Sequence, residues 1–92
     1  MRRLIWTEPA KEDLTRIRRE LTQLSPLGAK RIGARVVELV RHLRRNPEQG
    51  PMGRIPGIRE LVITNTELIV LYVVKDEDVF ILGVVSGRQD RG

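Results

Sequence analysis

Few side chains in these 92 residues could carry acid–base or metal chemistry. Cys is absent and His42 is the single His, so neither a thiolate metal site nor a cluster of His ligands can form within one chain. We interpret His42 as a boundary residue, because it falls one step off an apolar helical stripe without a partnering carboxylate or nucleophile. Tyr72 lies inside an apolar run, where a core-edge position with its hydroxyl at the rim fits better than a catalytic acid. We therefore expect no metal, cofactor or small-molecule substrate.

Cations are abundant and unevenly placed. Residues 1–45 hold twelve Lys or Arg against five Asp or Glu, whereas residues 46–92 hold five against seven, giving the net charge of +5. The positive field of residues 1–45 favours an acidic partner, which could be nucleic acid or an acidic protein segment. The charge alone does not distinguish these two partners. Binding of single-stranded nucleic acid is poorly supported, because only three aromatic side chains could stack on bases: Trp6, Tyr72 and Phe80.

Six residues are candidates for contact with a partner or target. They are Arg16, Arg31, Arg35, Arg59, Tyr72 and Arg88. An alternative for Arg59 is a surface ion pair with Glu60 or Glu67, and Arg-rich helix faces are commonly solvated surface.

The elements that must position these residues begin with three apolar runs, at residues 59–64, 68–74 and 79–85. Polar clusters separate them, a pattern typical of an antiparallel meander. The middle run is apolar on both faces, which predicts a central strand covered at least in part on both sides.

Two amphipathic helices precede the meander. Residues 3–6 suggest a short strand with Trp6 as a packing anchor, and Thr7 then predicts a helix from about Glu8. Ser25-Pro26 ends this helix and starts a second one, which should run to Asn46-Pro47. The apolar stripes are Ala10, Leu14, Ile17, Leu21 and Leu24 in the first helix, and Leu27, Ile32, Val36, Leu39 and Leu43 in the second.

The chain therefore predicts one α+β domain over residues 1–92: an N-terminal strand, an antiparallel helical hairpin, and then a three-stranded antiparallel meander. The hairpin should cover one face of an antiparallel sheet. Residues 46–57, rich in Pro and Gly, form a crossing loop. No apolar stretch approaches the ~18 residues of a membrane span, so we expect a cytoplasmic protein without membrane contact.

Several segments, in this order, resemble the RelE/ParE toxin superfamily of bacterial toxin–antitoxin modules. They are Leu-Ile-Trp-Thr-Glu-Pro-Ala-Lys-Glu-Asp-Leu (4–14), Asn46-Pro47, Gly-Ile-Arg-Glu-Leu-Val-Ile (57–63), Leu-Tyr-Val-Val (71–74) and Val-Phe-Ile-Leu-Gly-Val-Val (79–85). The resemblance covers nearly the whole chain. It implies a small toxin neutralised by a cognate acidic antitoxin that wraps around it. The ParE branch acts on DNA gyrase, whereas the RelE branch cleaves messenger RNA in the ribosome.

The chemistry of RNA cleavage helps to choose between the branches, since it needs a base, an acid and cations around the phosphate. Ribonuclease members carry an Arg three residues before the Tyr of the middle strand, and here that position is Ile69. They also carry a Tyr or His after the last strand; this chain has neither, although Arg88 matches an Arg common to both branches. Ser86-Gly87 stands where ParE-like members often have His-Gly.

We therefore predict a ParE-like toxin that inhibits gyrase by binding, without chemistry of its own. Ribosome-dependent messenger RNA cleavage is the alternative. A basic nucleic-acid-binding module is a third possibility, supported by charge alone.

Overall fold

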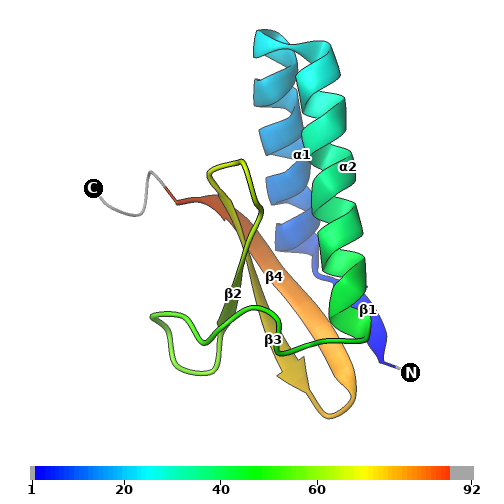
Figure 1. Cartoon of the computed structure of the whole chain (residues 1–92), viewed down its shortest axis with the longest axis vertical. Coiled ribbons are helices and arrows are strands. Elements are labelled where there is room, and N and C mark those ends of the chain that lie inside the picture. Colours follow the sequence, from blue (N-terminus) through cyan, green and yellow to red (C-terminus); the bar gives the residue numbers. More distant parts are fainter. Residues whose placement is uncertain (1, 88–92) are drawn as a thin grey trace.

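The computed structural model describes residues 2–87, and its elements follow the predicted order (Figure 1). They are β1 (Arg3–Trp6), α1 (Glu8–Leu24), α2 (Pro26–Arg41), the 3-10 turn η1 (His42–Arg44), β2 (Arg59–Val62), β3 (Leu68–Lys75) and β4 (Asp78–Ser86). The α+β arrangement of strand, helical hairpin and meander is confirmed. Within residues 2–87, no helix has the length and apolar character needed to cross a bilayer.

The helix boundaries follow from capping side chains. Thr7 caps α1, and its hydroxyl accepts the Ala10 N–H. Ser25 closes α1 by donating its N–H to the Leu21 carbonyl at 2.9 Å, and its hydroxyl accepts the Gly28 N–H at 3.0 Å to start α2. Ser25 therefore both ends and begins a helix, as predicted.

The second helix ends earlier than predicted. The α-helical geometry stops at Arg41, and a 3-10 turn follows from His42 to Arg44. The His42 carbonyl accepts the N–H groups of both Arg45 and Asn46, which closes the turn before Pro47. The Pro marks the limit of the helical region but not the last α-helical residue.

The four strands form one sheet in the order β1-β4-β3-β2. The meander pairs are antiparallel, as predicted, but β1 pairs in parallel with β4, from Arg3 beside Asp78 to Trp6 beside Ile81. The expectation of a wholly antiparallel sheet was wrong. Parallel strands need a long connection, and along the sequence the helical hairpin and two strands separate β1 from β4, which allows β1 to join as a parallel strand. An ion pair of 2.7 Å between Arg3 and Asp78 marks the start of this pairing.

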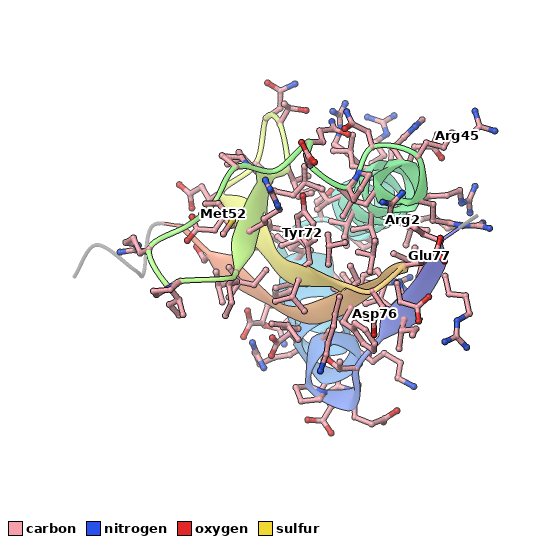
Figure 2. The ribbon with its side chains drawn as sticks, turned by 90° about the horizontal axis from the view of Figure 1, so that it is seen from below. Arg2, Arg45, Met52, Tyr72, Asp76 and Glu77 are labelled. Carbon is pink, nitrogen blue, oxygen red and sulfur yellow. The ribbon has the colours of Figure 1, made fainter. Side chains whose placement is uncertain are left out.

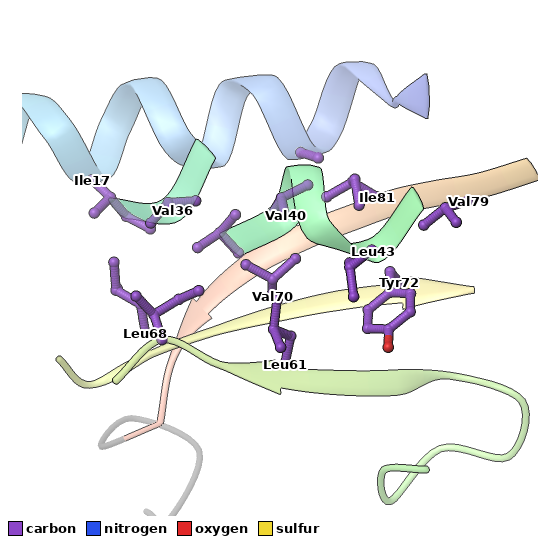
Figure 3. Close-up of a cluster of buried hydrophobic side chains, with 13 residues drawn as sticks. Ile17, Val36, Val40, Leu43, Leu61, Leu68, Val70, Tyr72, Val79 and Ile81 are labelled. Atoms are coloured by element: carbon purple, nitrogen blue, oxygen red, sulfur yellow. The ribbon is translucent and has the colours of Figure 1, made fainter. Parts of the chain in front are cut away.

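The core lies between the helices and one face of the sheet, here called the inner face (Figure 3). Its fully buried members include Val36 and Val40 of α2, Leu43 of η1 and Val70 of β3. Trp6 packs at the border of this cluster, as predicted.

Helix α1 takes a different position, along β4 beyond the end of β1. The Thr7 hydroxyl donates to the Ile81 carbonyl at 2.7 Å, and Asp13 Oδ2 accepts the Val84 N–H at 3.0 Å. Asp13 thus satisfies a strand N–H that β1 is too short to reach, since β1 pairs with residues 78–81 only.

The two faces of the central strand are covered to different extents. On β3, Leu68, Val70 and Tyr72 are buried, whereas the alternating Ile69, Leu71 and Val73 are only half-buried. The expectation of cover at least in part on both faces agrees with this burial. The cover is complete only on the inner face, because the buried core cluster that includes both helices lies there.

Candidate binding surface

The side of the sheet away from the core is apolar and open. Strand register places seven apolar side chains on this outer face: Ile5, Val62, Ile69, Leu71, Val73, Phe80 and Val85. Six are half-buried, and Val62 is 56% exposed on the edge strand β2. Charged residues of the same face lie toward its borders: Arg3, Glu60, Lys75 and Asp78. A contiguous apolar surface of this kind is typical of a protein–protein contact.

A groove of about 370 Å³ lies where α1 meets the ends of β3 and β4. Its lining includes the apolar side chains Ile17, Leu21, Leu68, Val84 and Val85. Its charged lining residues are Asp13, Arg16, Glu20 and Glu67. With three acids and one cation, this groove is not part of the basic surface of the protein.

Tyr72 does not belong to any surface. Its side chain is fully buried, and its hydroxyl donates to the Pro47 carbonyl at 2.7 Å while accepting the Gly50 N–H at 2.9 Å. Burial raises the pKa of the phenol above its ordinary value, although the Gly50 contact and the Arg59 charge act in the opposite direction. The prediction of Tyr72 as a partner contact was wrong, and so was a hydroxyl at the rim, because the crossing loop covers this end of β3 (Figure 2).

Arg59 also serves the loop. Its Nη1 donates to the Gly50 carbonyl at 2.8 Å, so the structure gives it a backbone partner in place of the ion pair considered from sequence. Met52 forms an isolated bridge with Arg59, and Glu60 N–H donates to the Pro51 carbonyl at 3.0 Å. The loop therefore lies along the first half of β2.

The three helical Arg residues have different surroundings. Arg16 pairs with Asp13 at 3.2 Å beside the groove, and Arg35 Nη1 donates to the Thr64 hydroxyl at 2.9 Å, which connects α2 to the turn after β2. Arg31 is exposed on α2. The structure thus brings Arg59 and Tyr72 together at the loop, while Arg16, Arg31 and Arg35 lie on the hairpin.

One of the six candidates remains. Arg88 lies outside the described residues. His42, interpreted from the sequence as a boundary residue without a partnering carboxylate, is exposed in η1 with its Nε2 3.4 Å from Glu38 Oε1. The expectation that no carboxylate partners it was therefore wrong.

Asp13 is the important residue that sequence reasoning did not select. It looked like one more charge on the polar face of α1, yet it binds both a strand N–H and Arg16. A signal was present, since Asp13 lies three residues after Ala10 and four before Ile17, the two buried residues of α1.

The described surface has the apolar character of a protein-binding surface. The middle of the outer face carries aliphatic side chains, and within residues 2–87 no group of three or more His, Cys, Asp or Glu side chains could hold a metal ion. Tyr72 and Arg59 are engaged with the loop backbone. An apolar face flanked by an amphipathic groove can bury a protein segment of similar character.

Comparison with known proteins agrees with this architecture. Residues 4–91 match the sequence model described as "ParE toxin of type II toxin-antitoxin system, parDE". Toxin RelE2 of Caulobacter vibrioides is 37% identical over 73 residues, which cover 79% of this chain and 82% of that protein.

Solved structures give the same result. The chain is similar to one in the structure titled "Chromosomal ParDE TA system from P. aeruginosa", with a TM-score of 0.86 and 28% identity, covering 94% of this chain and 96% of the other. A chain of the intact E. coli RelBE toxin–antitoxin complex shares the fold, with a TM-score of 0.58 and 18% identity over 94% of this chain and 96% of its own. The resemblance inferred from sequence is thereby confirmed: the chain belongs to the ParE toxin family of type II toxin–antitoxin systems.

Proposed function

We propose that this toxin inhibits DNA gyrase by binding it in the cytoplasm, and that a cognate antitoxin neutralises it by covering the groove and the outer face. The toxin performs no chemistry of its own. The observation that carries this proposal is the apolar character of the outer face, where Ile69, Leu71 and Val73 of β3 lie side by side with residues of β4.

This surface offers little to a ribonuclease. Cleavage through a 2′-hydroxyl needs a base, an acid and cationic groups at the phosphate, and loss of one transition-state contact typically costs ~10²–10³ in rate. Ile69 lies on the face opposite Tyr72, so the position that carries an Arg in ribonuclease members is aliphatic on the open side of this sheet. The Tyr72 phenol is bound to the loop with its pKa raised, and His42 belongs to η1 beside Glu38.

The same surface suits an antitoxin. Half-buried aliphatic side chains and the groove beside α1 can bury the apolar face of an extended or helical segment. Acidic residues of such a segment would meet Arg31 and Arg35 on α2, and these charges would act mainly on the association rate. The similarity to a chain of the P. aeruginosa ParDE toxin–antitoxin system supports a partner of this kind.

The direct test is inhibition of DNA supercoiling by purified gyrase. We expect the isolated toxin to slow supercoiling, and the cognate antitoxin to restore it. Arg88→Ala should weaken inhibition without changing the urea midpoint of unfolding, whereas Arg45→Ala, which removes an exposed Arg in the middle of the chain directly after η1, should leave inhibition unchanged.

Cells provide the complementary comparison. Expression without the antitoxin should cause filamentation and a DNA-damage response, with transcripts intact at codon resolution. Codon-phased cleavage of translated messages together with normal supercoiling would contradict the gyrase proposal in favour of ribosome-dependent RNA cleavage.

A further inference from the structure

The net charge of this protein is concentrated in one part of the helical hairpin. Residues 16–35 hold six of the 17 Lys and Arg residues but only one of the 12 Asp and Glu residues, a net charge of +5. The other 72 residues hold eleven of each and are neutral. These twenty residues form the distal part of the hairpin, and its end, where α1 and α2 are joined, extends past the sheet (Figure 1).

Most of this charge is not neutralised locally. Arg16 pairs with Asp13, and Arg35 binds the Thr64 hydroxyl. Within residues 2–87, no carboxylate forms an ion pair with Arg18, Arg19, Lys30 or Arg31. The distal hairpin therefore presents a positive field to the solvent.

The end of the hairpin also exposes two leucines. Leu24, the last residue of α1, is 84% exposed, and Leu27 at the start of α2 is 59% exposed. Both belong to the stripes expected to face a core, yet the helices extend past the sheet and leave them uncovered. Beside Leu27 is a shallow recess of about 460 Å³ whose lining includes Arg18 and Lys30.

We propose that this tip, formed by Leu24 and Leu27 within residues 16–35, docks the toxin on its target, and that the target presents an acidic protein surface with an apolar recess. This inference rests on the proposed function, in which toxicity comes from binding a protein. The leucines supply the buried contact, and the surrounding cations steer the approach.

The tip chemistry favours a protein over nucleic acid. Exposed leucines gain from entering an apolar pocket, whereas on a duplex they would have to unstack base pairs, at a cost of a few kcal/mol per step. The tip also has no aromatic side chain on which a base could stack, since residues 16–35 contain no Phe, Tyr or Trp.

The test uses the full chain with Leu24→Gln and Leu27→Gln combined. Both side chains are already exposed and Gln is a good helix former, so folding and antitoxin binding should be unchanged. We expect affinity for purified gyrase and potency in the supercoiling assay to fall by about tenfold or more, from the lost burial of two leucines. Growth arrest after expression should weaken in parallel.

A matched control removes two other exposed apolar side chains, both about as exposed as Leu27. Met52→Gln with Ile55→Gln, at positions 58% and 56% exposed in the crossing loop, should keep full potency. Charge is tested separately: Arg19→Gln with Lys30→Gln should slow association with gyrase at low salt, and high salt should remove the difference.

The outcomes separate the two proposals. A Leu24/Leu27 variant that arrests growth as well as the parent protein overturns docking through the tip, whatever the target is. If the parent protein arrests growth while gyrase supercoils DNA normally, gyrase is not the target. Loss of that growth arrest in the Leu24/Leu27 variant would still support docking through the tip. If the variant loses binding to naked duplex DNA in parallel with its potency, the tip binds nucleic acid, and the proposal of an acidic protein surface is overturned.

Discussion

Tyr72 and Gly50 are in direct contact, 22 positions apart in the chain. The Gly50 N–H donates to the Tyr72 hydroxyl at 2.9 Å, and a Cβ built on Gly50 would lie 2.9 Å from that same oxygen. Only Gly allows the loop to approach the phenol this closely. The single Tyr of the chain therefore holds the crossing loop against β3.

Removal of that hydroxyl should loosen the loop. In Tyr72→Phe, the buried Gly50 N–H and the Pro47 carbonyl both lose a partner, and we expect the free energy of unfolding to fall by about 1–3 kcal/mol. Urea denaturation measures the loss, and hydrogen exchange should increase mainly in residues 46–58. An unchanged urea midpoint would show that the hydroxyl does not hold the loop.

The same phenol should make stability depend on pH in the alkaline range. Burial raises the pKa of Tyr72 in the folded state above its ordinary value of 10.0, so the unfolded chain loses this proton first. The contribution to stability is complete below pH 10.0 and is lost as pH rises through the folded-state pKa. Stability measured upward from pH 9 should fall more steeply in the parent protein than in Tyr72→Phe, and parallel curves would contradict this.

The two faces of the sheet should respond differently to a buried charge. Val70 is fully buried on the inner face, so Val70→Asp should cost several kcal/mol and unfold the domain. Val62→Asp, on the outer face at 56% exposure, should leave a cooperative unfolding transition and weaken the complex with the antitoxin. Circular dichroism and antitoxin titration measure these outcomes, and a folded Val70→Asp protein would refute the inner face as the core.

Asp13 should matter more than other charges of α1. Asp13→Ala leaves the Val84 N–H without its partner, and we expect a loss of about 1–2 kcal/mol. Asp13→Asn keeps an acceptor oxygen and should lose less. Arg16→Gln removes only the exposed ion-pair partner of Asp13 and should lower the free energy of unfolding by well under 1 kcal/mol. An equal loss of stability in all three variants would mean that the ion pair, and not the hydrogen bond to Val84, carries the effect.

Local signals in the sequence were sufficient for most of the fold. Thr7 and Ser25 specify helix starts through their own hydroxyl groups, and the polar clusters around Asn65 and Asp76 specify turns. Both Asn65 and Asp76 adopt positive φ, a conformation that their short polar side chains tolerate. Information of this kind lies within a few residues and can be read directly.

Long-range relationships could not be predicted in the same way. Nothing in residues 3–6 indicates that they pair in parallel with residues 78–81, and an apolar run does not reveal which of its faces the helices will cover. The partners of Tyr72 and Arg59 lie in a loop that has no periodicity to place it. The surface and core roles of these two residues could therefore be assigned only from the tertiary structure.

The strand order has a consequence for synthesis of this protein on the ribosome. β4 is translated after every other described element, yet it lies in the interior of the sheet between β1 and β3. Until residues 78–86 emerge, β1 has no neighbouring strand and the inner face lacks Val79, Ile81 and Val84. A nascent chain, or one left unfinished by a stalled ribosome, cannot assemble this sheet. Toxic activity should therefore arise only after translation of β4 is finished. An antitoxin that is already present can bind the toxin as soon as it folds.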